Sequence, residues 1–189
     1  MTEQEKMLQG ELYDATDLDL VLARRRARHL TKALNESRDD EQEHREQIIT
    51  ELFGSMGDGI WIEPPFYCDY GTNIHLGSAV FFNFNCIILD PARVDIGDNV
   101  LIGPAVQIYT ATHTMEHETR RAGLELARPV RIGSHVWIGG GAIINPGVTI
   151  GSRTVIGSGS VVTREIPADV LAAGNPCRVI RKLDAPSLS

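Results

Sequence analysis

Cysteine, aromatic residues and long apolar runs are all scarce in this sequence of 189 residues. The three cysteines, Cys68, Cys86 and Cys177, are odd in number and irregularly spaced, which argues against a disulfide framework and predicts free thiols in a reducing compartment. No apolar run approaches the roughly 20 residues of a membrane span, and the first residues lack the apolar core of a signal peptide. The formal net charge of −7 argues against a nucleic-acid binder. We therefore expect a cytoplasmic protein with neither nucleic acid nor a membrane as partner.

What the chain has instead is a six-residue repeat, clearest between residues 130 and 166. An aliphatic residue returns at every sixth position, and a small or β-branched residue follows each one four positions later. The aliphatic positions are Ile132, Ile138, Ile144, Ile150, Ile156 and Val162. A period of six fits neither an amphipathic helix nor a two-sided strand, and it is typical of a hexapeptide β-solenoid. We expect each hexad to form a short strand inside a three-sided prism, with Gly, Asn or Ser at the corners, where Gly and Asn tolerate a positive φ.

The repeat extends upstream with two irregularities. Residues in phase with it are Tyr70, Leu76, Phe82, Ile88, Ile96, Ile102 and Ile108. Two extra residues interrupt it around Asp90-Pro91-Ala92, and a polar segment at about 110–128 interrupts it again. Because Ile132 lies four whole hexads after Ile108, we predict a side loop that leaves the prism and rejoins it in phase. Polar excursions from a regular scaffold commonly carry function.

Residues 1–58 differ in composition from the repeat: they are rich in charged residues, poor in glycine and free of proline. Thr16-Asp17 predicts the start of a helix that runs to about Leu34, with Asp19 completing a capping box with Thr16. A second helix is expected from Ser37 to about Phe53. We interpret residues 1–58 as a helical cap on a solenoid at 59–183, followed by a flexible tail at 184–189, because a solenoid needs its open end covered.

One histidine of the side loop is a candidate catalytic base. His113 directly follows a predicted strand ending at Thr112, so the scaffold fixes its backbone. A neutral imidazole is the usual side chain for taking a proton from a hydroxyl near pH 7. Spacing alone leaves a solvated, non-catalytic histidine as the alternative.

Histidine also allows a metal site. His75, His113, His117 and His135 could converge from successive coils or from different subunits, and zinc needs three or four ligands. The γ-class carbonic anhydrases bind zinc on such a β-helix, but the H-x-x-x-x-H spacing used by that family is absent here. We therefore predict no metal, and keep a metal-dependent enzyme of that type as an alternative.

The C-terminal segment AAGNPCRVIRKL is basic in an otherwise acidic chain. Arg178, Arg181 and Lys182 lie close together, and Arg164 is nearby. Such a cluster is either an ordinary solvated end or a clamp for phosphate groups, which match the arginine fork. Because the chain lacks G-x-x-x-x-G-K-[ST], we do not expect an ATP-driven reaction.

These segments together resemble the maltose and galactoside O-acetyltransferases of the hexapeptide acyltransferase superfamily. The resemblance rests on SHVWIGGGAIINPGVTIG, VIGSGSVVTREIP, AAGNPCRVIRKL, EPPFYCDYGTNIHLG, FFNFNCIILD and IGDNVLIGPAVQIYTATH, and on KMLQGELYDATD near the N-terminus. It covers roughly residues 5–183. The hexads specify only the superfamily, whereas the cap, TATH and GNPCRVI point to the sugar acetyltransferases.

The resemblance implies a left-handed parallel β-helix that forms a homotrimer, with acetyl-CoA bound between subunits. It implies transfer of an acetyl group from acetyl-CoA to a hydroxyl of maltose, glucose or a related sugar, by general-base catalysis in a ternary complex. His113 would be the base and Asn83 would place the hydroxyl. The acceptor contacts that it implies are Asp69, Asp90 and Asp17. The coenzyme contacts that it implies are Gly140, Ser158, Thr163, Arg164, Arg178 and Arg181.

The sequence departs from the family pattern at three positions. Thr114 follows the histidine where the family commonly has proline, Pro91 replaces an acidic acceptor residue, and Ala15 stands where an aspartate is expected, between Asp14 and Asp17. These departures leave the acceptor open, so acetyl transfer to a non-sugar acceptor is a further alternative. An inactive structural solenoid is disfavoured by the loop histidine and the basic segment together.

Overall fold

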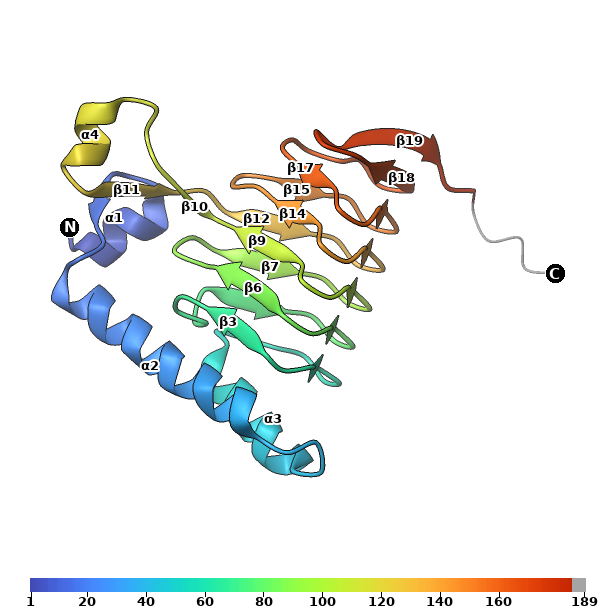
Figure 1. The fold of residues 1–189 in the computed structure, drawn as a ribbon, viewed down its shortest axis with the longest axis horizontal. Helices are drawn as coiled ribbons and strands as arrows, with labels where there is room; N and C mark the ends of the chain where they lie inside the picture. The colour runs from blue at the N-terminus through green and yellow to red at the C-terminus, as the bar shows by residue number, and fades with distance from the viewer. Residues whose placement is uncertain (185–189) are drawn as a thin grey trace.

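In the computed structural model, which describes residues 1–184, the chain forms a parallel β-solenoid with helices at its N-terminal end (Figure 1). The predicted all-β solenoid is therefore confirmed. Apart from Asp184, the predicted tail lies outside the described residues. No helix of the described residues is long and apolar enough to cross a membrane.

Three stacked sheets form the faces of the prism. The first face contains β4 (Ile74–Leu76), β7 (Val94–Ile96), β12 (Val130–Ile132) and β15 (Thr149–Ile150). The second contains β2 (Trp61–Ile62), β5 (Phe81–Phe82), β8 (Leu101–Ile102), β13 (Trp137–Ile138), β16 (Val155–Ile156), β18 (Val170–Ala173) and β19 (Arg178–Lys182). The third contains β3 (Phe66–Cys68), β6 (Cys86–Leu89), β9 (Gln107–Tyr109), β14 (Ile143–Ile144) and β17 (Val161–Val162).

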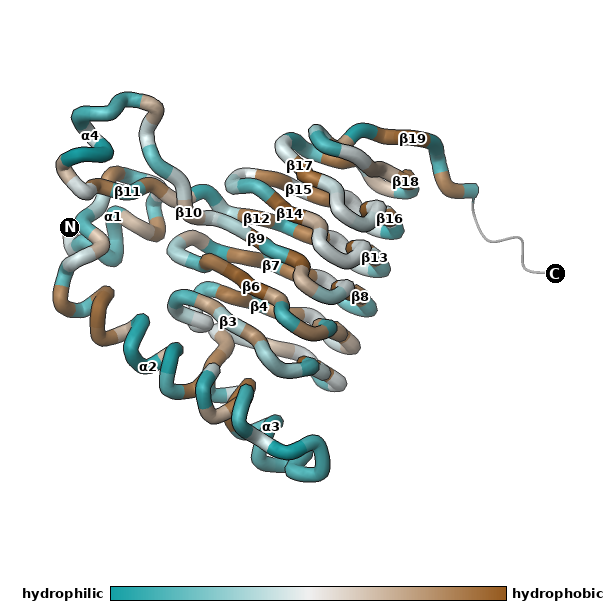
Figure 2. The backbone as a smooth tube through the Cα atoms, in the orientation of Figure 1, coloured by the Kyte–Doolittle hydropathy of each residue, from teal (hydrophilic) through white to brown (hydrophobic). Residues whose placement is uncertain are grey.

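The hexad positions stack in register inside the prism. On the second face Ile102, Ile138 and Ile156 pair directly, and all three side chains are buried. The small residues four positions later are buried as well, including Thr154 and Ser160. Hydrophobic segments accordingly recur in the strands of successive coils (Figure 2). Each coil exposes an edge that the next coil covers, so stability accumulates by stacking.

Two details of the predicted repeat were wrong. The register pairs Cys68 with Ile88, so Cys68 and not Tyr70 occupies the hexad position of the first coil. The first coil therefore carries two extra residues between Cys68 and Leu76, just as the second does after Ile88. Tyr70 instead joins a separate cluster with Met7, Tyr13 and Leu20 under the N-terminal segment.

The corners are less restricted in residue type than we expected. Glycine does take positive φ at several of them, but other residues do so as well: Ala79, Asn85, Asn99, Ala105, His135, Arg153 and Asp169. Backbone bonds between successive corners help to fix this conformation; His135 N–H, for example, donates to Asp98 O at 2.8 Å. Repeated ladder bonds can hold a left-handed residue that an isolated turn would disfavour.

Three helices form the N-terminal cap: α1 (Glu3–Gln9), α2 (Leu18–Glu36) and α3 (Gln42–Leu52). We did not predict α1, although Thr2 and Glu5 form its capping box. Asp17, not Thr16, caps α2, because its side chain accepts from Asp19 N–H at 3.1 Å. Ser37 does not start α3; its hydroxyl donates to Leu34 O at 2.6 Å and ends α2.

The cap covers the open edge of the first coil. Asn35 of α2 acts there like a neighbouring strand: its side-chain amide donates to Phe66 O at 3.0 Å, and its side-chain oxygen accepts from Phe66 N–H at 2.8 Å. The predicted boundary between residues 58 and 59 falls between α3 and β2. Capping of this kind removes an exposed sheet edge.

The interruption after β9 is a side loop that rejoins in phase, as predicted. It contains β10 (Ala111–Thr112), α4 (His117–Arg121) and β11 (Leu124–Ala127), and the next strand, β12, pairs with β7. β11 also pairs antiparallel with β1 (Tyr13–Asp14) of the cap, so the N-terminal segment and the loop lie side by side (Figure 1). At the other end, the basic segment forms the antiparallel pair β18–β19.

Candidate active site

His113 follows β10 directly and lies at the exposed base of the side loop. Its backbone is held from both sides, because β10 pairs with β11 and Thr110 at the end of β9 is anchored. The Thr110 hydroxyl donates to Leu89 O and accepts from Ala92 N–H, both at 2.9 Å. An exposed imidazole on a fixed backbone is suited to meet a substrate without a large rearrangement.

Asp69 and Asp90 follow the stacked strands β3 and β6 and lie at the corner from which this loop departs; we call it the Asp69 corner. The Asp69 side chain is half-buried, and within residues 1–184 no hydrogen bond or ion pair engages its carboxylate. Burial raises the pKa of Asp69, while Arg24 opposes the rise. A half-buried carboxylate without a protein partner can accept hydrogen bonds from a ligand.

Asp90 has a different environment from the one implied for an acceptor contact. Its side chain has no exposed surface, and one carboxylate oxygen accepts from the N–H groups of Asp69 and Tyr70 at 3.0 and 2.9 Å. Burial raises the pKa of Asp90 to about 7, against the effect of these backbone bonds. In this arrangement Asp90 supports the backbone of Asp69 and does not reach a ligand itself.

Sequence reasoning missed the polar side chains that complete this corner. The Tyr13 hydroxyl donates to Glu125 Oε2 at 2.9 Å, which joins the cap to the side loop. Arg24 of α2 donates to the Tyr70 hydroxyl at 2.6 Å and to Ala15 O at 2.5 Å. The polarity of the loop hinted at Glu125, but the contact depends on the pairing of strands more than 100 residues apart in sequence.

Asn83 lies at the opposite end of the third face, before β6, whereas His113 comes after β9. Its side-chain oxygen accepts from Phe84 N–H at 2.8 Å. At about 3.3 Å per residue, the length of the four-residue strand β6 already separates the two ends of this face by roughly 13 Å. One chain alone therefore does not bring the two predicted catalytic side chains together.

The predicted coenzyme residues are also divided between the two ends of the third face. Gly140 and Ser158 stack at the Asn83 end, where a side chain on the neighbouring Gly139 would lie 2.5 Å from Ser158 N. Thr163 and Arg164 follow β17, toward the end of the face where the side loop departs, and Arg178 and Arg181 are exposed on β19. None of these three arginines makes an ion pair with an acid among residues 1–184. Their charges are thus available to an anionic ligand.

The histidines do not gather into a metal site in the part of the chain that the structure describes. That region holds no group of three or more His, Cys, Asp or Glu residues placed to bind an ion. His75 Nδ1 lies 2.8 Å from the Ser55 hydroxyl oxygen, and His117 Nε2 lies 3.1 Å from Glu118 Oε1. The three cysteines are unpaired and buried, and burial raises the pKa of each thiol.

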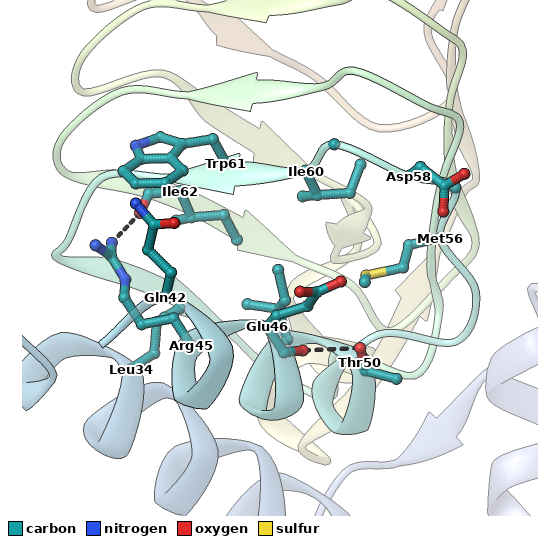
Figure 3. Close-up of a pocket in the computed structure, with 13 residues that line it drawn as sticks. Leu34, Gln42, Arg45, Glu46, Thr50, Met56, Asp58, Ile60, Trp61 and Ile62 are labelled. Carbon is teal, nitrogen blue, oxygen red and sulfur yellow. Dashed lines mark hydrogen bonds between the residues drawn. The ribbon is translucent and has the colours of Figure 1, made fainter. Parts of the chain in front are cut away.

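A hollow of about 490 Å³ lies elsewhere, between α3 and β2 (Figure 3). Arg45 extends along it, donates to Ile62 O at 2.5 Å and lies over the Trp61 ring at 5.2 Å from the ring centroid. No predicted site residue lines this hollow. Its polar contacts join the cap to the first coil, so we assign it a structural role.

The fold and the repeat define a hexapeptide-repeat transferase. Two family models match the chain: the maltose acetyltransferase hexapeptide capping motif at residues 6–57 and the bacterial transferase hexapeptide (six repeats) at residues 129–164. The chain belongs to the maltose and galactoside acetyltransferase family, a family of acetyl-CoA-dependent O-acetyltransferases, as the following relatives show.

The chain is 54% identical to nodulation protein L of Rhizobium meliloti (strain 1021), over 94% of this chain and 97% of that protein. A maltose O-acetyltransferase from Clostridium difficile 630 superposes with a TM-score of 0.97, at 52% identity over 98% of this chain and 99% of that one. A galactoside acetyltransferase solved in complex with coenzyme A gives a TM-score of 0.94, at 45% identity over 97% of this chain and 92% of that one. The family assignment and the role of acetyl-CoA predicted from sequence are therefore confirmed.

Proposed function

We propose that the protein transfers the acetyl group of acetyl-CoA to a hydroxyl of maltose, glucose or a related sugar. The observation that carries this proposal is the placement of exposed His113 beside the Asp69 corner, on a loop held by two flanking strands. Similarity to a maltose O-acetyltransferase and a galactoside acetyltransferase supports a sugar as the acceptor. Asp69 accepts hydrogen bonds from the sugar, Asp90 holds the Asp69 backbone, and Asp17, at the start of α2, is a further contact for the acceptor.

His113 acts as the general base of a direct transfer. Its imidazole takes the proton of the attacking hydroxyl as the hydroxyl oxygen bonds to the thioester carbon. The carbon–sulfur bond then breaks, and the departing CoA thiolate receives the proton back from the imidazolium. Asn83 places the hydroxyl, and a backbone N–H near Gly140 stabilises the developing oxyanion. No acyl-enzyme is needed, because the thioester is already activated and both substrates are bound together.

The coenzyme is held through its phosphates by the exposed basic residues. Arg178 and Arg181 on β19 supply the guanidinium forks, and Arg164 adds a third positive charge. Ser158 and Thr163, which lie toward opposite ends of the third face, donate hydroxyl hydrogen bonds to the coenzyme. Three free cysteines and a cytosolic cosubstrate fit a cytoplasmic location.

The active sites form between subunits of a homotrimer. The separation of Asn83 from His113 within one chain supports this, because two copies can combine the Asn83 end of one with the side loop of the next. Large apolar side chains exposed on the second face support it as well: Leu101 and Trp137 are paired in register and are 52% and 54% exposed. Contiguous apolar exposure of this kind marks an interaction surface.

Product analysis tests the proposal. The protein is incubated with acetyl-CoA and, in separate reactions, with maltose, glucose or a β-galactoside, and the masses of the sugar and of the intact protein are measured by mass spectrometry. We expect maltose to gain one acetyl group while the protein mass stays unchanged. Failure to acetylate any sugar would refute the acceptor class, and an acetylated protein intermediate would refute direct transfer.

A further inference from the structure

Glu125 occupies a defined place beside His113. The pairs Ala111–Ala127 and Thr112–Leu126 align β10 with β11, so the next residues in the register are His113 and Glu125. On its other side β11 pairs with β1, which places Tyr13 opposite Glu125. Directly opposed residues of antiparallel strands project to the same face of the sheet. Extended by one residue beyond β10, this register places His113 next to Glu125, which is itself paired with Tyr13.

The cap fixes one oxygen of the Glu125 carboxylate and leaves the other available. The Tyr13 side chain is buried, and its hydroxyl donates to Glu125 Oε2 at 2.9 Å. No hydrogen bond or ion pair reaches Oε1 from any other residue between 1 and 184. A carboxylate held at one oxygen is pre-oriented to accept a hydrogen bond at the other.

A second carboxylate lies close by. Tyr13, which holds Glu125, packs in one buried cluster with Tyr70, the residue after Asp69, so this contact brings Glu125 to the Asp69 corner. Glu125 is accordingly one of the groups that raise the pKa of Asp69. Arg24 does not neutralise either carboxylate directly, because its donors reach Tyr70 and Ala15. Arg28 also contributes to the local potential but makes no ion pair in the described chain. The Asp69 carboxylate and Glu125 Oε1 have no donor among residues 1–184, so a ligand that carries several donors can satisfy both.

We propose that Glu125, held by Tyr13, is a specificity-determining residue that together with Asp69 binds neighbouring hydroxyls of the acceptor. The ligand class is an uncharged polyol ring with at least two adjacent free hydroxyls. Sugars that carry a phosphate or carboxylate near those hydroxyls are disfavoured by repulsion from the two acids. This inference rests on the proposed sugar acetyltransferase function and adds the part of the site that selects the acceptor.

The test compares steady-state kinetics of the wild-type protein with those of Glu125→Gln. We expect the KM for maltose to rise roughly 10- to 100-fold, the range for one hydrogen bond to a charged group, while the KM for acetyl-CoA changes less than about twofold. Glu118→Gln is the matched control, because Glu118 is an exposed acid on α4 of the same loop. It should leave both KM values unchanged.

Tyr13→Phe provides an independent variant that keeps the buried ring and removes only the hydroxyl. Like Glu125→Gln, it should raise the KM for maltose, but only by about 3- to 10-fold, as expected for loss of a neutral hydrogen bond. A second readout compares activity with glucose and with glucose 6-phosphate. The wild-type protein should prefer glucose, and Glu125→Gln should reduce the difference in activity between the two sugars.

Equal rises in both KM values, or an unchanged KM for maltose and unchanged sugar preference in Glu125→Gln, would overturn the assignment. If that variant does not fold, as judged by circular dichroism, the result with Tyr13→Phe decides in the same way. A wild-type protein without sugar-dependent release of CoA would instead refute the proposed function. The two failures are therefore distinguishable.

Discussion

Combining two inactive variants should restore activity if each active site takes His113 from one subunit and Asn83 from its neighbour. His113→Ala removes the general base. Loss of a general base typically lowers the rate 10²–10⁴-fold, and we expect a loss of about this size here. Asn83→Ala removes the group that places the hydroxyl. Each variant alone forms only sites that lack one of the two side chains.

The structure sets the size of the restored activity. Asn83 and His113 lie at opposite ends of the third face, separated by roughly the 13 Å length of β6. In a random equal mixture of the two variants, a site is intact only when one chain supplies His113 and the next supplies Asn83. Each condition is met half of the time, so about one quarter of the wild-type activity should return in a closed symmetric ring.

Co-expression of differently tagged chains provides the assay, with release of the CoA thiol as the readout. The matched control mixes wild type with a chain that carries both substitutions. An intersubunit site then retains about one quarter of full activity, whereas a site within one chain retains about one half. Two variants that stay inactive when mixed, together with half activity in the control, would refute the shared site.

Three further predictions concern the coenzyme, the core and a buried acid. Replacing Arg178 and Arg181 together with alanine should raise the KM for acetyl-CoA by at least about tenfold and that for sugar far less, since each guanidinium makes charge-assisted bonds to phosphate; equal rises would contradict this role. Ile138→Ala should lower the free energy of unfolding by about 2–5 kcal/mol in denaturant titration, because its fully buried side chain leaves a cavity between stacked coils; a loss below about 1 kcal/mol would show that the prism collapses around the gap. The pKa of Asp90 is raised from 3.8 to about 7, so the folded state holds this proton more tightly and stability should fall as pH rises from about 4 to 7. Asp90→Asn should flatten that decline in thermal midpoints, and an equally steep decline in the variant would assign it to other groups.

The solenoid could be predicted because its signal is local and repeated. Every sixth residue faces the same interior, so Ile138 and its equivalents report the fold without knowledge of any distant contact. The same logic failed at Tyr70, because the extra residues at the Asp69 corner change the phase and only the pairing of Cys68 with Ile88 reveals it. Capping signals were equally local but ambiguous, with Thr16 and Asp17 adjacent and only one able to cap α2.

The candidate site was only partly predictable for a different reason. His113 could be found because it directly follows a regular strand on a polar loop. Glu125 and Tyr13 could not, because their contact joins segments 112 positions apart. The separation of Asn83 from His113 was also hidden, since it follows from how the third face is stacked.

Sugar-dependent release of CoA from acetyl-CoA tests the central claim most directly. The wild-type protein and His113→Ala are assayed with maltose, with glucose and with a β-galactoside. We predict thiol release with maltose or glucose that falls at least about 10²-fold in the variant. Undiminished release by His113→Ala would contradict the role of the base, and no release with any sugar would contradict the proposed acceptor.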